Sequence, residues 1–269
     1  MAMLHADFPK YLMEAAKLSM KEWLGGLTAS CPNLDERQRL VLAELQENGI
    51  AVIPDYWTRE QAFSVRDALK VYFESGQDSD LDCGAYVRHW SNRPMDYDQG
   101  VKRMYHPDKL MPELASHRFN GFLMDIIHGY YGKPFYSQGL MFQHNLPNTK
   151  TGAFHVDGFK PEFKTFVYLD DVTEENGPFT YIPKTHRAHW RRVQKELAPK
   201  NDVGNRTNFS EEELEAKYRA AAKMYTASAG TLILADVRGF HRGAPQKHGE
   251  RNALVNYIMP KSGELSLEK

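Results

Sequence analysis

The sequence predicts a mainly β protein with flanking helices, and two features of its pattern support this. Apolar runs of strand length, separated by turn residues, are concentrated between about residues 135 and 260, whereas stretches with helical spacing precede them. The sequence has no internal repeat, low-complexity tract or linker-like segment. We therefore expect one domain over residues 1–269, in which helices buttress a single β core.

The composition argues against several classes of protein. Apolar residues make up 42% of the 269 positions, which is enough for a sizeable core. The 34 Lys and Arg residues nearly balance the 35 Asp and Glu residues, and the net charge is −1. This balance argues against a general nucleic-acid binder or membrane-surface binder. Cys31 and Cys83 are too few for a Cys-based zinc site or a disulfide framework.

The sequence shows no clear targeting signal. The stretch from Leu4 to Leu18 is interrupted by charged residues, which is not typical of a secretory signal. No apolar run approaches the roughly 20 residues that span a bilayer. We therefore expect a cytoplasmic protein with no nucleic-acid or membrane partner, and the sequence leaves its oligomeric state open.

Three helices and one short strand are expected in the first part of the chain. Residues Phe8–Leu24 and Asp35–Asn48 have helical spacing, and Gly49 occupies a position where glycine often ends a helix. The short β run Ile50–Pro54 follows. A third helix is expected from Thr58 to about residue 74, because Thr-x-x-Gln at its start matches a capping box.

Residues Gln77–Met111 follow no helix or strand pattern and are rich in polar and aromatic side chains. A segment of this length without secondary structure is functional or disordered in a compact domain, and its aromatic residues favour a function. A helix is expected next, from Met111 to Tyr131. We therefore expect residues 1–132 to form a mostly helical buttress with one lid loop.

Strand-like runs dominate the rest of the sequence, so residues 133–260 are expected to form the β core. A charged stretch from about 187 to 229 has mostly helical spacing and is expected to be a helical insertion. The expected strands cover residues 140–145, 154–159, 165–169 and 178–183, a run that starts at 230, and a run at 253–258.

The pair His155-x-Asp157 lies within one of these expected strands. Residues i and i+2 of a strand point to the same face, so the imidazole and the carboxylate can reach one metal ion together. After a later buried strand and turn comes a second histidine, His241. Two histidines and one carboxylate leave three coordination positions open, which is the arrangement of non-haem Fe(II) oxygenases. Ten residues after His241, Arg251 opens the last apolar run.

The order and spacing of several motifs resemble the phytanoyl-CoA dioxygenase family of Fe(II)/2-oxoglutarate-dependent oxygenases, over roughly residues 48–260. No single motif is specific, but together they are. The motifs are Asn48-Gly-Ile-Ala-Val-Ile-Pro54, His155-x-Asp157, Leu169-Asp-Asp-Val-x-x-Glu-Asn-Gly177, Ile182-Pro-Lys-Thr-His186, the strand from Gly230, His241 and Arg251. One departure is Lys184, which stands where many family members have glycine.

The resemblance implies a double-stranded β-helix, which is a jelly-roll, cupin-like core open at one end. It also implies that His155, Asp157 and His241 bind Fe(II) and carry the catalysis. Arg251 is implied to bind 2-oxoglutarate, and O2 is the second cosubstrate. Gln143, on the strand before the metal-binding strand, is a further candidate to hydrogen-bond 2-oxoglutarate. The expected reaction is hydroxylation of a C–H bond with release of succinate and CO2.

Other outcomes and other functions stay open. In related halogenases a small residue replaces the carboxylate, so Asp157 favours hydroxylation over chlorination. Desaturation, epimerisation and cyclisation use the same ligands and stay open. A cupin-like isomerase or hydrolase that does not use 2-oxoglutarate is the main alternative, and Arg251 argues against it because a hydrolase has no use for that cation. A barrel that only binds a ligand has no chemical need for the complete ligand set.

The expected substrate is a polar small molecule, and residues 77–111 are expected to close over it as a lid. This segment contains few aliphatic residues, so an anionic or sugar-like compound is favoured over an acyl chain. Arg88, Arg103 and Tyr105 are candidate substrate-binding residues, because they offer hydrogen-bond donors and a flat aromatic face. The sequence does not identify the substrate.

Overall fold

A computed structural model of the chain describes most of its length. The described residues are 13, 16–17, 20, 32–89, 100–149, 152–158, 160–187, 208–210, 212 and 214–265. The expected helix Phe8–Leu24 therefore lies largely outside the described residues.

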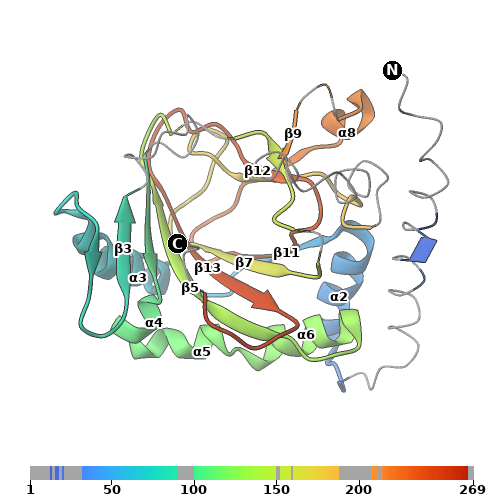
Figure 1. Cartoon of the computed structure of the whole chain (residues 1–269), viewed down its shortest axis with the longest axis horizontal. Coiled ribbons are helices and arrows are strands. Elements are labelled where there is room, and N and C mark those ends of the chain that lie inside the picture. The colour runs from blue at the N-terminus through green and yellow to red at the C-terminus, as the bar shows by residue number, and fades with distance from the viewer. Residues whose placement is uncertain are drawn as a thin grey trace.

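The described residues form two facing β-sheets, one of eight strands and one of five (Figure 1). The larger sheet has the order β1-β11-β7-β13-β5-β4-β3-β2, and the smaller has the order β10-β8-β12-β6-β9. The strands of the larger sheet are β1 (Ile50–Ile53), β2 (Ser79–Asp80), β3 (Tyr86–His89), β4 (Val101–Tyr105), β5 (Tyr136–Asn145), β7 (Phe163–Tyr168), β11 (Leu232–Asp236) and β13 (Arg251–Met259). Those of the smaller sheet are β6 (Phe154–His155), β8 (Phe179–Tyr181), β9 (Asn208–Phe209), β10 (Lys223–Tyr225) and β12 (His241–Gly243).

Along the chain, the strands from β5 to β8 alternate between the two sheets, and so do β11, β12 and β13. Neighbouring strands pair antiparallel in both sheets. This alternation defines a double-stranded β-helix. The expected mainly β fold with a jelly-roll core is therefore confirmed.

Helices cover the outer face of the larger sheet. The described helices are α2 (Glu36–Asn48), α3 (Arg59–Lys70), α4 (Pro107–Leu110), α5 (Ala115–Arg118), α6 (Gly121–Tyr131) and α8 (Ala216–Ala220), with 3-10 turns at Val71–Phe73 and Pro112–Leu114. Buried side chains of α2, α3 and α6, such as Leu45, Leu69 and Ile126, belong to one apolar cluster with outward-facing strand residues. Figure 1 shows α4, α5 and α6 following the side of the β5–β13 pair opposite to β12.

Local sequence signals begin and end the first two described helices as expected. Asp35 caps α2 and Thr58 caps α3, and each forms the reciprocal capping box with a glutamine three residues later. Gly49 ends α2 in the left-handed conformation, with φ of +78°. Gly49 turns the chain directly from α2 into β1. The expected starts of both helices and the expected end of α2 are confirmed, whereas α3 ends at Lys70 and a 3-10 turn follows it.

The expectation that Gln77–Met111 lacks strands is wrong. Strands β2, β3 and β4 of this segment extend the larger sheet beyond β5, and residues 90–99 lie outside the described residues. Val87 and Met104 are fully buried in the apolar layer beneath the helices. The alternation was hard to recognise because the opposite, inner face of these strands carries Arg88 and Arg103 in register with each other.

Two other expectations need correction. The expected helix Met111–Tyr131 is interrupted near Phe119, because Asn120 begins α6 anew by accepting a hydrogen bond from the Leu123 N–H. The expected helical insertion at 187–229 has only one short helix, α8, among its described residues, together with β9 and β10. Residues 188–207 of that stretch lie outside the described residues.

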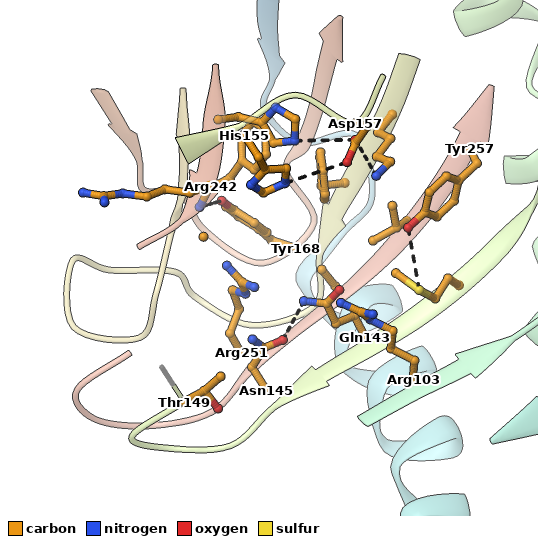
Figure 2. A pocket seen from close by; sticks show the side chains of 18 residues that line it. Arg103, Gln143, Asn145, Thr149, His155, Asp157, Tyr168, Arg242, Arg251 and Tyr257 are labelled. Carbon is orange, nitrogen blue, oxygen red and sulfur yellow. Dashed lines mark hydrogen bonds and ion pairs between the residues drawn. The ribbon is translucent and has the colours of Figure 1, made fainter. Parts of the chain in front are cut away.

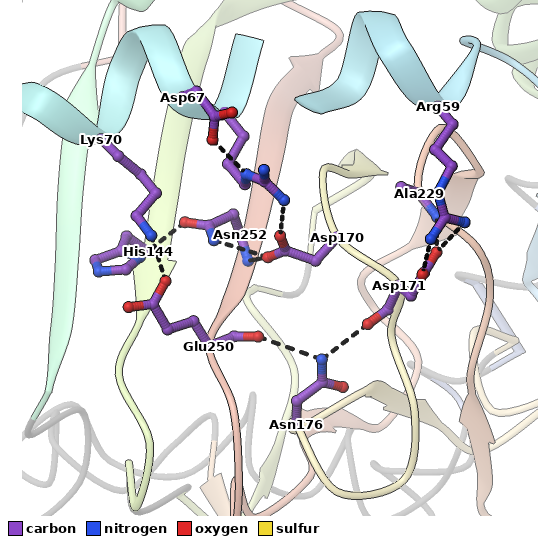
Figure 3. Close-up of polar contacts among 11 residues, drawn as sticks. Arg59, Asp67, Lys70, His144, Asp170, Asp171, Asn176, Ala229, Glu250 and Asn252 are labelled. Atoms are coloured by element: carbon purple, nitrogen blue, oxygen red, sulfur yellow. Dashed lines mark hydrogen bonds and ion pairs between the residues drawn. The ribbon is translucent and has the colours of Figure 1, made fainter. Parts of the chain in front are cut away.

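A polar network ties helix α3 and the turn after β7 to the beginning of β13 (Figure 3). Asp170 accepts hydrogen bonds from both the backbone and the side-chain nitrogen of Asn252, each at 2.7 Å. Arg66 of α3 pairs with the other oxygen of Asp170 at 2.9 Å, and His144 of β5 bonds the Asn252 side-chain oxygen at 2.7 Å. Asn252 is therefore held by Asp170 and His144, and Arg66 in turn holds Asp170.

The residue on the other side of Arg251 is held in the same way. The side-chain nitrogen of Asn176 donates to the carbonyl oxygen of Glu250 at 3.2 Å, and the Glu250 carboxylate pairs with Lys70 of α3. Glu250 and Asn252 are thus both anchored by the turn that follows β7. This arrangement fixes the backbone on both sides of Arg251.

Gly230 is a position where only glycine fits, and it yields a prediction about stability. Its φ is +90°, and an added Cβ would lie 2.1 Å from the carbonyl oxygen of Trp57. Gly230→Ala should lower the free energy of unfolding by about 2–5 kcal/mol, from left-handed strain plus overpacking. Gly76→Ala is the matched control, because Gly76 also has positive φ but no atom within 4 Å of an added Cβ.

The control should cost only the strain of about 1–2 kcal/mol. Urea denaturation of the three proteins measures both values. Equal losses in the two variants would contradict the predicted clash at Gly230.

Candidate active site

The smaller sheet brings the two candidate metal-binding histidines together. Strands β6 and β12 are antiparallel neighbours, and His155 and His241 are direct cross-strand partners. Their ring centroids are 4.4 Å apart. Asp157 follows just after β6, where its N–H donates to the carbonyl oxygen of Val237 at 3.1 Å. Strand pairing therefore places His155 and His241 side by side, although they are 86 residues apart in the sequence.

The three side chains present a set of atoms suited to a metal ion. Their candidate ligand atoms all lie within 4.8 Å of one another. The Nε2 atom of His155 is 3.8 Å from one Asp157 carboxylate oxygen, and Nε2 of His241 is 3.5 Å from the other (Figure 2). The expected His155, Asp157 and His241 cluster is thus assembled by the fold.

Backbone carbonyls orient both imidazole rings. Nδ1 of His155 is 3.2 Å from the carbonyl oxygen of Ala153, and Nδ1 of His241 is 2.8 Å from that of Gly239. Because a carbonyl oxygen can only accept a hydrogen bond, each Nδ1 must carry the proton. The Nε2 lone pairs are therefore left facing Asp157, as metal coordination requires.

The electrostatics favour the protonation states that bind a metal ion. Burial, helped by the neighbouring His241, lowers the pKa of His155 to about 4. Burial opposes ionisation of Asp157, but Lys164 and His241 hold the pKa of its carboxyl well below the usual value. At neutral pH the imidazole of His155 is neutral and the carboxylate of Asp157 is ionised, which are the forms that coordinate divalent ions.

These residues open onto a cavity of about 300 Å³ between the two sheets. The smaller sheet contributes His155 and His241, and the inner face of the larger sheet forms the opposite wall. The charged side chains among the described lining residues are Arg103, Asp157, Lys164, Arg242 and Arg251. The cavity is therefore strongly polar for an interior space.

Arg251 is the first residue of β13, is 9% exposed, and lines the cavity. One of its terminal nitrogens donates to the carbonyl oxygen of Gly177. The network of Figure 3 holds the residues before and after it, so the guanidinium projects from a fixed backbone. The fold thus places the expected Arg251 in the same cavity as the histidines and Asp157 (Figure 2).

Gln143 of β5 also lines the cavity. Its amide nitrogen donates to the side-chain oxygen of Asn145 at 2.8 Å, and Asn145 is the cross-strand partner of Arg251. Gln143 was predicted from the sequence as a cosubstrate contact, whereas Asn145 was not. The signal was available, because residues i and i+2 of a strand share a face.

The three candidate substrate-binding residues are separated by the fold. Arg103 lines the cavity, whereas Arg88 and Tyr105 are not among its described lining residues. Arg88 pairs with Asp80 at 2.7 Å on the edge of the larger sheet. Tyr105 is 5% exposed and stacks on Tyr86, with ring centroids 4.8 Å apart. Of the three, only Arg103 is positioned to contact a ligand in the cavity.

Lys164 was missed by the sequence analysis, and it lies at the centre of the site. Its ammonium nitrogen is 2.6 Å from the second carboxylate oxygen of Asp157 and 4.3 Å from the centroid of the Tyr257 ring. Burial disfavours its charged form, but Asp157 holds the pKa of Lys164 above its usual value. Lys164, Phe166 and Tyr168 alternate along β7 and all line the cavity, so period two was again the available signal.

A jelly roll with two imidazoles and one carboxylate converging inside it defines a class of metal-binding double-stranded β-helix proteins. Within that class, the chain belongs to the phytanoyl-CoA dioxygenase (PhyH) family, whose sequence profile matches residues 45–252. No curated protein sequence gives a significant match to the chain.

Several solved structures share the fold. HygX from Streptomyces hygroscopicus, with nickel and 2-oxoglutarate bound, is 15% identical over 87% of this chain and 96% of that chain, with a TM-score of 0.55. SnoK, a non-heme α-ketoglutarate-dependent carbocyclase from nogalamycin biosynthesis, is 16% identical over 88% and 95%, with a TM-score of 0.60. EvdO2 from Micromonospora carbonacea var. aurantiaca is 18% identical over 90% and 97%, with a TM-score of 0.60. At these identities the similarity establishes a common fold.

Among the described residues, no helix is both long enough and apolar enough to cross a bilayer.

The geometry of the cluster generates a prediction about metal binding. His241→Ala should weaken binding of Ni(II) or Fe(II) by more than the roughly 10–100-fold that loss of an outer partner costs, because it removes a direct ligand. Calorimetric titration under anaerobic conditions measures the affinity. His128→Ala, on the outer helix α6, is the control and should bind metal as the wild type does. Wild-type affinity in His241→Ala would show that the cluster is not the metal site.

Proposed function

We propose that the protein is an Fe(II)/2-oxoglutarate-dependent dioxygenase that hydroxylates a C–H bond of a polar small molecule and releases succinate and CO2. The observation that carries the proposal is one cavity in which two imidazoles and a carboxylate face a buried arginine. Fe(II), 2-oxoglutarate and O2, when bound together, supply the oxidising chemistry that an unactivated C–H bond requires.

The chain's own residues have distinct roles in this proposal. His155 and His241 hold Fe(II) through their Nε2 atoms, whose direction the Ala153 and Gly239 carbonyls set. Asp157 supplies the anionic ligand. This set of neutral nitrogen and carboxylate oxygen donors suits Fe(II) and leaves positions open for the cosubstrates.

Arg251 is the proposed anchor for the far carboxylate of 2-oxoglutarate. A guanidinium offers five N–H donors in a planar fork, and the Gly177 carbonyl takes up one terminal nitrogen. A buried cation attracts an anion strongly because little water competes for it. Gln143, whose amide is held by Asn145, lines the same cavity and is proposed as a further contact to the cosubstrate.

Features of the site support hydroxylation, and a structural neighbour supports a small-molecule substrate. Asp157 occupies the position that must be vacated for halide binding, so hydroxylation is favoured over halogenation. Among the structural neighbours, HygX has been solved with hygromycin B bound, which supports a small-molecule substrate. We propose Arg103 as a substrate contact, because it lines the cavity whereas Arg88 and Tyr105 do not.

Succinate release tests the function directly. The purified protein should form succinate from 2-oxoglutarate under air with Fe(II), and a suitable polar compound should stimulate the rate. The same assay without O2 is the control and should give none. Turnover of a substrate without 2-oxoglutarate would instead favour the alternative, a cupin-like isomerase or hydrolase.

The proposed role of Arg251 predicts a specific kinetic change. Removing one partner of a buried charge pair costs about 2–5 kcal/mol, or roughly 30- to 5,000-fold in affinity. Arg251→Ala should raise the KM for 2-oxoglutarate within this range and leave the metal affinity nearly unchanged. Arg251→Lys should fall between, because it keeps the charge and loses the fork.

Arg88→Ala is the matched control for this experiment. Arg88 is a cation of the same sheet that pairs with Asp80 at the edge, so its loss should leave the KM unchanged. An unaltered KM in Arg251→Ala would remove the basis for the cosubstrate assignment.

A further inference from the structure

The cavity contains a buried cation that the proposed catalytic set does not use. Lys164 is 9% exposed and lines the cavity from β7. Lysine is almost never buried to this extent without an ionic partner. Its close partner in the described structure is Asp157, at 2.6 Å, and its ammonium also lies over the ring of Tyr257.

Binding of Fe(II) would reduce how well Asp157 compensates the positive charge of Lys164. Asp157 is the carboxylate proposed to bind Fe(II), and a carboxylate shared with a divalent ion compensates a neighbouring ammonium less well. The ion also adds positive charge within a few ångströms of Lys164. Glu162 interacts electrostatically with Lys164 but is not among the described lining residues. The loaded cavity therefore calls for further negative charge beside Lys164.

Lys164 lies far from Arg251, so the negative charge needed beside Lys164 is not supplied by the carboxylate of 2-oxoglutarate that Arg251 is proposed to bind. Lys164 is the cross-strand partner of Tyr257 on β13, whereas Arg251 begins that strand six residues earlier. At about 3.3 Å per residue, Tyr257 and Arg251 are roughly 20 Å apart along the strand. Figure 2 likewise shows Tyr257 and Arg251 on different sides of the cavity. Lys164 thus faces the part of the cavity away from the cosubstrate anchor.

The overall charge of the cavity has the same implication. Its described charged lining residues comprise four cations and one anion. The two positive charges of Fe(II) and the two negative charges of 2-oxoglutarate cancel each other. The described lining side chains thus carry more positive than negative charge, which favours an anionic ligand.

We propose that Lys164 and Tyr257 form a subsite for a carboxylate group of the primary substrate, so that the substrate is a small organic acid. This inference rests on the proposed function. The ammonium binds the carboxylate as a compact point charge, and the Tyr257 ring packs against the carbon skeleton beside it. The same ammonium disfavours substrates that carry an amine in this position, because like charges repel.

Binding measurements test the subsite without any need for turnover. The protein is first loaded with redox-inert Ni(II) and saturating 2-oxoglutarate, which blocks the anchor at Arg251. A panel of small aliphatic and aromatic carboxylic acids is then titrated by calorimetry, each beside its primary carboxamide and its amine. The compounds that bind should be acids, and each should bind at least about tenfold better than its amide, a difference expected when one buried charge partner is lost.

Variants then assign the preference to Lys164. Lys164→Met should weaken binding of the acids by about 30-fold or more and leave the affinity for Ni(II) equal or higher, because a cation beside the metal is removed. Lys164→Arg should keep the preference for acids. Lys102→Met is the matched control, because Lys102 lies on β4 of the same sheet but is not among the described lining residues, and it should change nothing.

The outcomes separate this inference from the proposed function. Failure of the wild type to bind Ni(II) or 2-oxoglutarate overturns the proposed function. Normal binding of both, with acids no better than amides, overturns the subsite alone, and this comparison does not depend on the folding of any variant. A loss of Ni(II) affinity in folded Lys164→Met also overturns it, because Lys164 would then act only by positioning Asp157.

Discussion

Charge compensation inside the space between the two sheets is the constraint on which the rest of the structure depends. Asp157 and Lys164 compensate each other at 2.6 Å, and Arg251 is held by the carbonyl of Gly177. Such groups are costly to bury without partners. The hydrophobic stabilisation that permits them comes from the opposite face of the larger sheet, where helices α2, α3 and α6 cover an apolar cluster. One sheet therefore separates a layer that stabilises the fold from a layer that carries the chemistry.

The turn between β7 and β8 links these two layers. Asp170 holds Asn252, Asn176 holds Glu250, and Gly177 accepts from Arg251, so this one turn contacts the first two residues of β13 and the residue before them. Arg66 of α3 extends the network to the outer helices through Asp170. The motif from Leu169 to Gly177, which is part of the family resemblance, thus has a structural role. It fixes the backbone from which the buried guanidinium projects, and geometry of this kind is a requirement for a preorganised site.

Structural features that depend on local hydrogen bonds could be predicted from the sequence, whereas features that depend on contacts between the two sheets could not. The Thr58 capping box and the Gly49 helix end were correctly predicted because the hydrogen bonds that make them lie within four residues. The strands β3 and β4 were missed because Arg88 and Arg103 occupy the inner face, and charge on that face hides the hydrophobic alternation. Lys164 was missed for the same reason. Charged residues inside a sheet look like surface residues until the facing sheet is known.

The sequence by itself determined the helix caps through local hydrogen bonding and most strand positions of the core through side-chain periodicity. Motif spacing identified the residues that resemble a set of metal and cosubstrate ligands. Only the tertiary structure decided which of them meet. It joined His241 to His155 by cross-strand pairing, placed Arg103 in the cavity and Arg88 at the sheet edge, and set Lys164 against Asp157. The physical reason is that strand register and the closure of two sheets are non-local, so the contacts across the cavity are fixed by pairing partners far apart in the chain.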